Sequence, residues 1–178
     1  MQWYNEPKSF SVDGSKISVS VPGKTDYWRV TLHQFIKDDA PFYFKEVEGD
    51  FEATVKFTAK YETLYDQAGL MVRQDDKVWM KCGIEYYKKV QHASTVITRD
   101  FSDWSISPVS DNPESVWVRA KRTKECIETF YSVDGTNFVQ IRQGYLSKAS
   151  KLQVGIMAAA PTGDGFDVVF EDLEVKQL

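Results

Sequence analysis

Residues 51–60 read Phe51-Glu52-Ala53-Thr54-Val55-Lys56-Phe57-Thr58-Ala59-Lys60. In this stretch each apolar side chain is followed by a polar or charged one. Because successive side chains of a β-strand point to opposite faces, the alternation predicts a strand with one face on a hydrophobic core and the other in water. Working outward from this segment, the same period of two recurs along most of the chain.

Similar alternating runs predict about ten strands in total. They occupy residues 17–21, 67–73, 78–87, 93–99, 116–122, 126–133, 138–142, 152–158 and 166–175. The Asp-Gly pairs at 13–14 and 134–135 predict tight hairpins, because glycine adopts the positive φ that such turns require. No segment predicts a helix of useful length, and residues 31–37 predict one turn at most. The pattern is typical of an all-β sandwich or barrel.

Bulk composition indicates one folded domain over residues 1–178, since 42% of the residues are hydrophobic and 14% are aromatic. The net charge is −4 and the charges are interspersed, so we expect no nucleic-acid partner. No apolar run is long enough to cross a bilayer, and residues 1–7 lack the features of a signal peptide, so we expect no membrane partner. Cys82 and Cys126 lie in apolar runs, which favours free thiols and a cytoplasmic location.

The hairpin formed by residues 67–73 and 78–85 has a register that its side chains determine. Pairing Ala68, Leu70 and Val72 with the apolar side chains of the second strand requires a loop with an odd number of residues. That register directs Val78, Met80, Cys82 and Ile84 into the core and groups Trp79, Lys81, Gly83 and Glu85 on the other face. We therefore expect an aromatic ring, a cation and a carboxylate to share one surface.

Several motifs together resemble the DUF1349 family. They are residues 65–73 (Tyr-Asp-Gln-Ala-Gly-Leu-Met-Val-Arg), 79–85 (Trp-Met-Lys-Cys-Gly-Ile-Glu) and 102–105 (Ser-Asp-Trp-Ser), with further matches at 3–7, 49–51, 132–135, 154–156 and 159–161. The resemblance covers nearly the whole chain. It implies a two-sheet antiparallel jelly-roll sandwich of the concanavalin A-like lectin/glucanase type, an intracellular location and a role in the control of carbohydrate metabolism.

The family motifs supply six candidate ligand-binding residues, which are Asp66, Gln67, Trp79, Lys81, Glu85 and Trp104. Sugars bind where aromatic faces meet their C–H groups and amides or carboxylates bind their hydroxyls. In this hypothesis Trp79 and Trp104 stack on the ligand, Gln67 and Glu85 bind hydroxyls, and Asp66 fixes the loop. Lys81 orients Glu85 or meets an anionic group. The structural alternative is that the two tryptophans fill gaps and Lys81 pairs with Glu85 across the surface.

Two other functions remain open from the sequence. A glycoside hydrolase would need a second carboxyl group near Glu85, for which Asp66 and Asp103 are the candidates. A protein-interaction module, with a metabolic enzyme as partner, would use an aromatic and basic patch formed by Arg73, Trp79, Tyr86, Tyr87 and Trp117. Uncovered strand edges are compatible with either a monomer or a homodimer.

No cofactor or metal site is expected. His33 and His92 are the only histidines, and neither lies at a spacing that is typical of metal ligands. Calcium is a minor alternative at the acidic turns, which contain Asp38-Asp39, Asp75-Asp76 and the pair Asp164 and Asp167. Taken with the family motifs, the sequence favours the hypothesis of a non-enzymatic module that binds a carbohydrate-type ligand on the concave face of one sheet.

Overall fold

The computed structural model describes residues 1–178 as sixteen β-strands without a helix. The strands are β1 (Gln2–Tyr4), β2 (Phe10–Asp13), β3 (Lys16–Pro22), β4 (Tyr27–Arg29), β5 (Ile36–Asp38), β6 (Phe42–Glu48), β7 (Phe51–Ala59), β8 (Gln67–Arg73), β9 (Val78–Tyr87), β10 (Val90–Arg99), β11 (Phe101–Pro108), β12 (Ser115–Thr123), β13 (Cys126–Ser132), β14 (Val139–Tyr145), β15 (Lys151–Ala159) and β16 (Gly165–Gln177).

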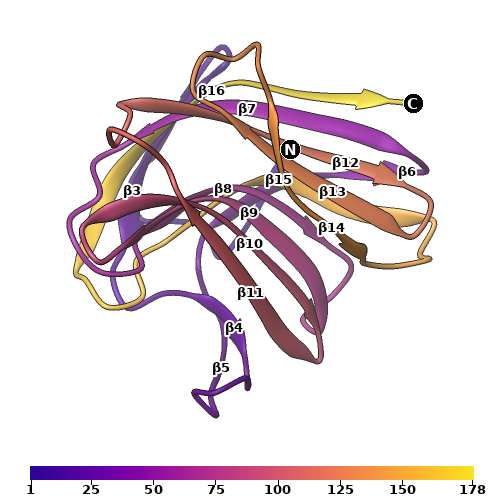
Figure 1. Cartoon of the computed structure of the whole chain (residues 1–178), viewed down its shortest axis with the longest axis horizontal. Helices are drawn as coiled ribbons and strands as arrows, with labels where there is room; N and C mark the ends of the chain where they lie inside the picture. The colour runs from indigo at the N-terminus through magenta and orange to yellow at the C-terminus, as the bar shows by residue number, and fades with distance from the viewer.

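Fourteen of these strands form two seven-stranded antiparallel sheets that pack face to face (Figure 1). Sheet A has the order β1-β6-β15-β8-β9-β10-β11, and sheet B has the order β14-β13-β12-β7-β16-β3-β2. The two remaining strands, β4 and β5, form a separate hairpin that projects from the sandwich (Figure 1). The predicted all-β, two-sheet jelly-roll sandwich is confirmed.

The main hydrophobic core lies between the two sheets and contains 30 buried residues. In β7 the apolar side chains of the alternating stretch, Phe51, Ala53, Val55 and Phe57, are all buried within it. The intervening polar side chains of β7 lie on the opposite, partly exposed face. The alternating sequence of β7 therefore places one face of the strand on the core and leaves the other face partly exposed, as predicted.

The β8–β9 hairpin has the register that its side chains predict. Leu70 pairs with Cys82 and Val72 with Met80, and these apolar side chains belong to the core between the sheets. The backbone N–H of Gln74 donates to the carbonyl of Val78 at 2.9 Å, which closes a loop of three residues. Trp79, Lys81 and Glu85 consequently share the outer face of sheet A, which is the face turned away from sheet B.

The β4–β5 hairpin covers part of this outer face. Beneath it lies a second hydrophobic cluster of nine buried residues, which includes Tyr27 from the hairpin, Phe42 and Phe44 from β6, Met71 from β8 and Trp79 from β9. Sheet A is therefore buried on both faces along much of β8 and β9, and every residue of β8 is buried. Trp79, Lys81 and Glu85 therefore share one face, as predicted, but that face is largely covered and does not form an open surface.

Six strands lie outside the predicted set, namely β1, β2, β4, β5, β6 and β11. The most consequential is β11, because the Ser-Asp-Trp-Ser motif, which lies outside the predicted strands, forms part of this edge strand and pairs with β10 along its length. Both Asp-Gly pairs lie in hairpins, with positive φ at both glycines. Two residues separate β2 from β3, as expected for a tight turn, whereas six residues separate β13 from β14, so the second hairpin is not tight. Cys82 and Cys126 are both free, as predicted. The structure has no helix of the length and apolar character that a bilayer crossing requires.

Candidate functional site

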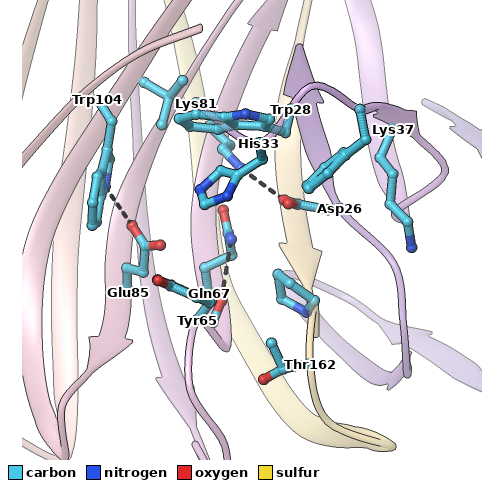
Figure 2. Close-up of a pocket in the computed structure, with 13 residues that line it drawn as sticks. Asp26, Trp28, His33, Lys37, Tyr65, Gln67, Lys81, Glu85, Trp104 and Thr162 are labelled. Atoms are coloured by element: carbon cyan, nitrogen blue, oxygen red, sulfur yellow. Dashed lines mark hydrogen bonds and ion pairs between the residues drawn. The ribbon is translucent and has the colours of Figure 1, made fainter. Parts of the chain in front are cut away.

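A pocket of about 330 Å³ lies on the outer face of sheet A, between the C-terminal half of β9 and the β4–β5 hairpin (Figure 2). Sheet A contributes Gln67, Lys81, Glu85, Val96 and Trp104 to its lining. The hairpin and the residue before it contribute Asp26, Trp28, His33, Phe35 and Lys37. Tyr65, Pro161 and Thr162, from two loops, complete the wall. Four of the six candidate residues therefore meet in one cavity.

Lys81 and Asp26 form an ion pair on the buried wall of this pocket. The Nζ of Lys81 lies 3.1 Å from Oδ1 of Asp26, and it also donates to the carbonyl of Tyr27 at 2.7 Å. Only 6% of the Lys81 side chain and 11% of the Asp26 side chain are exposed. The alternative in which Lys81 pairs with Glu85 is wrong, because Asp26 occupies the position of the partner.

Glu85 is bound by uncharged donors alone. Its Oε2 accepts hydrogen bonds from the Ser94 hydroxyl at 2.8 Å and from the Trp104 indole N–H at 2.9 Å. Its Oε1 has no hydrogen-bond partner and points into the pocket (Figure 2). Burial raises the pKa of the Glu85 carboxyl above its ordinary value, although nearby Lys81 and the two hydrogen bonds act in the opposite direction.

Aromatic rings stand on two sides of the polar wall. On one side Trp104 meets Tyr65 edge to face, with ring centroids 6.4 Å apart. On the other side Trp28 meets His33 edge to face at 5.7 Å, and Phe35 stacks on His33. Figure 2 shows Trp104 at the left of the space that Glu85 and Gln67 face and Trp28 above it.

Gln67 lies directly opposite Glu85 in the β8–β9 register. Its amide Nε2 donates to the carbonyl of Tyr65 at 3.2 Å, which leaves its Oε1 facing the pocket. A small niche of about 10 Å³ opens beside Gly83 between Gln67, Lys81, Glu85 and Ser94. This volume fits about one oxygen atom, such as a water molecule or a ligand hydroxyl.

Two candidate residues lie outside the pocket. Trp79 is fully buried beneath Tyr27 in the second hydrophobic cluster, so the prediction that it stacks on a ligand is wrong. Asp66 is also fully buried, and its carboxylate accepts hydrogen bonds from the backbone N–H groups of Glu62 and Thr63 and from the Thr63 hydroxyl. Asp66 therefore fixes the loop that carries Tyr65, as its assigned role required, and it contacts no pocket space.

The other sequence-based constellations are dispersed. Asp103 lies on the opposite face of β11 from Trp104, where it pairs with Arg142 at 2.7 Å, so it lies on the other side of the sheet from Glu85. Arg73 is buried against Asp38 at 2.8 Å, and Trp117 lies on sheet B. The proposed patch of Arg73, Trp79, Tyr86, Tyr87 and Trp117 therefore does not form one surface. No three His, Cys, Asp or Glu side chains gather into a group that would hold a metal ion.

Sequence reasoning missed the contribution of the hairpin. Tyr27, Trp28, His33 and Phe35 form an aromatic cluster in a segment without regular alternation, and that density was the available signal. What the sequence could not supply was the contact between Asp26 and Lys81, which are 55 residues apart.

Comparison with known proteins assigns the family. Residues 3–178 match the family model described as "Protein of unknown function (DUF1349)". The chain belongs to the DUF1349 family. "Regulation of enolase protein 1" of Saccharomyces cerevisiae is 35% identical over 170 residues, which cover 96% of this chain and 86% of the yeast protein. A protein of Emericella nidulans is 28% identical over 167 residues, which cover 87% of this chain and 82% of that protein.

Solved structures share the sandwich. The crystal structure of a functionally unknown protein from Saccharomyces cerevisiae has a TM-score of 0.96 and 33% identity, and the match covers 99% of this DUF1349 chain and 96% of that chain. Carbohydrate binding module CBM66 from Bacillus subtilis has a TM-score of 0.63 and 12% identity, with 98% and 95% covered. A mutant of the GH43 protein BlXynB from Bacillus licheniformis has a TM-score of 0.77 and 15% identity, and the match covers 97% of this chain and 36% of that one. The last two likenesses concern the fold alone.

The buried ion pair generates a stability prediction. Replacing Lys81 with Met leaves the Asp26 carboxylate buried without its cation, so we expect the free energy of unfolding to fall by about 3–5 kcal/mol. The matched control is Lys151→Met, because Lys151 pairs with Glu46 while more than half of each side chain is exposed. We expect the control to lose about 1 kcal/mol at most. Denaturant unfolding measures both, and equal losses would contradict the role assigned to Lys81.

The environment of Glu85 generates a pH-dependent prediction. A raised pKa in the folded protein means that folding favours the protonated carboxyl, so stability falls as the pH rises from the ordinary value of 4.5 through the folded pKa. Glutamine keeps an acceptor for Ser94 and Trp104 without the charge. We therefore expect Glu85→Gln to raise the free energy of unfolding at pH 7, and the difference to vanish below about pH 4. Urea unfolding at both pH values checks this, with Asp103→Asn as the control. A variant less stable than the parent at pH 7 would refute the argument.

Proposed function

We propose that this chain is a non-enzymatic module that binds a carbohydrate-type ligand in the pocket between sheet A and the β4–β5 hairpin. The observation that carries the proposal is the combination of free polar atoms on a buried wall with aromatic rings on both sides. This is the arrangement in which sugar hydroxyls meet hydrogen-bonding groups and sugar C–H faces meet aromatic rings.

The polar wall is matched to hydroxyl groups. Oε1 of Glu85 and Oε1 of Gln67 are acceptors without a partner, and both face the pocket. The Lys81 ammonium has three hydrogens and donates to two acceptors, Asp26 Oδ1 and the carbonyl of Tyr27, so one donor remains for a ligand. A hydroxyl both donates and accepts, which allows neighbouring hydroxyls to satisfy all three groups. The volume of about 330 Å³ lies at the small end of ligand pockets, which favours one or two sugar rings.

The comparisons support the same proposal at a coarser level. The fold is shared with a carbohydrate-binding module over 95% of that module's length. Because that identity is only 12%, the likeness supports the shared fold alone. The proposed class of ligand is inferred from the chemistry of the pocket.

Catalysis of glycoside hydrolysis is not part of this proposal. A hydrolase needs two carboxyl groups free to act on opposite sides of a sugar. Asp66 is committed to its loop and Asp103 lies on the far face of the sheet. The remaining carboxylate in the pocket, Asp26, is bound to Lys81 and to the backbone N–H of Tyr27. The pocket therefore offers Glu85 no second carboxyl group that is free of an ion pair.

Titration with a panel of mono- and disaccharides, monitored by protein NMR and calorimetry, tests the proposal. We expect the pocket residues to shift on binding, and Trp104→Ala or Trp28→Ala to weaken binding about tenfold or more through loss of a stacking face. Trp117→Ala, on the outer face of sheet B, is the matched control and should bind as the parent does. Binding that is unaffected by both pocket substitutions would refute the site. A reducing-sugar assay over a polysaccharide panel should stay silent, and any turnover would contradict the non-enzymatic assignment.

Contact with a metabolic enzyme is a second candidate function. The observation that favours it is the 35% identity with "Regulation of enolase protein 1". If regulation acts through contact, purified enolase from the same organism should form a complex with this chain at micromolar concentrations in sedimentation velocity. An unrelated glycolytic enzyme is the control. Absence of a complex with enolase under these conditions would remove direct contact as the route of regulation.

A further inference from the structure

We infer that the pocket prefers carbohydrate-type ligands that carry a protonated amino group, such as amino sugars, over neutral sugars of the same shape. This inference rests on the proposed function and narrows its ligand class. It is drawn from the distribution of charge on the pocket wall, from the free oxygen of Glu85 and from the aromatic rings around it.

The wall has one negative charge without a counter-charge. Lys81 neutralises Asp26 across 3.1 Å. Glu85 receives hydrogen bonds only from a hydroxyl and an indole, and it takes part in no ion pair. Lys37, at the rim, donates to the backbone carbonyl of Lys24 and lies 3.8 Å from Asp39. Figure 2 shows its Nζ directed away from the cavity. The pocket is therefore locally anionic.

A ligand ammonium would supply the missing charge. Glu85 is 94% buried, and a buried carboxylate without an ionic partner carries a desolvation cost that uncharged donors offset only in part. Its Oε1 is free and faces the cavity, so a cation can approach it directly. A hydroxyl also binds this oxygen but brings no charge. The ammonium therefore has the larger gain at this position.

The aromatic rings favour the same ligand. The faces of tryptophan and tyrosine attract cations through their negative π-surfaces, and rings that surround a cation add their effects. Trp28, Tyr65 and Trp104 border the cavity on two sides of Glu85. His33, His92, Tyr65 and Lys88 are further titratable groups nearby. The Lys88 ammonium lies over the Tyr87 ring, 5.1 Å from its centroid. His33 stacks on Phe35, and His92 lies opposite Glu85 in the β9–β10 register with its Nδ1 bound to the carbonyl of Val90.

The experiment compares matched ligands by calorimetry at about pH 7, where the amine of an amino sugar is mostly protonated. The probes are glucosamine, galactosamine and mannosamine, each paired with its neutral parent sugar and its N-acetyl derivative. Tetramethylammonium serves as a cation without hydroxyls. We expect at least one amino sugar to bind about tenfold more tightly than both of its neutral partners.

Glu85→Gln is the decisive variant, because it keeps the shape and one acceptor oxygen for Ser94 and Trp104 while an uncharged amide NH2 replaces the free carboxylate oxygen. It should lower the preference for the amino sugar to about onefold while neutral sugars still bind. The matched control, Asp103→Asn, removes a carboxylate from the opposite face of sheet A and should leave the preference unchanged.

The outcomes separate this inference from the proposed function. Neutral sugars that bind as tightly as amino sugars, or a preference that survives in Glu85→Gln, overturn the inference and leave the carbohydrate site standing. Binding of tetramethylammonium alone, abolished in Glu85→Gln, supports the cation site and overturns the carbohydrate function. Failure of every probe to bind overturns both.

Discussion

The buried ion pair between Lys81 and Asp26 is the contact on which the functional face depends. It ties the start of the β4–β5 hairpin to the centre of sheet A, and the Lys81 ammonium also holds the carbonyl of Tyr27. At the other end of the hairpin, Asp38 binds Arg73 at 2.8 Å. Between these polar contacts lies the apolar cluster around Trp79. Without the hairpin, sheet A would expose that cluster and lose one wall of the pocket.

The sequence was sufficient for the parts of the fold that depend on local periodicity. Strands such as β7, which alternate between the core and a partly exposed face, follow directly from the pattern of side chains. An odd number of residues in the loop of the β8–β9 hairpin could be predicted, because an even number would pair the apolar side chains of one strand with the polar side chains of the other. Strands β6 and β11 were missed for a physical reason. Phe42–Glu48 has adjacent apolar and adjacent charged residues, and the polar β11 is an edge strand whose main support is its pairing with β10.

The candidate site was predictable as a set of side chains on one face and unpredictable in its accessibility. Trp79, Lys81 and Glu85 do share the outer face of sheet A, yet Trp79 is sealed and Glu85 opens onto a cavity. The β4–β5 hairpin makes the difference, because it covers Trp79 and leaves a cavity beside Glu85. Its residues lie about fifty positions earlier in the chain. Local patterns determine the face of a strand to which a side chain belongs, whereas long-range packing determines what covers that face.

Along β9 the outer face changes its chemistry in steps of two residues, or about 6.6 Å. Trp79 is packed in apolar surroundings, Lys81 is buried with its charge balanced, Gly83 has no side chain, and Glu85 is buried with its charge unbalanced. Gly83 has no alternative here, since a Cβ at this position would lie 1.9 Å from the carbonyl oxygen of Ala68. The absence of a side chain leaves the niche that joins Lys81 to Glu85. At the Trp79 end, the outer face of β9 therefore stabilises the fold. At the Glu85 end, it keeps an unpaired charge beside a cavity, and an arrangement of this kind is typical of a ligand-binding site.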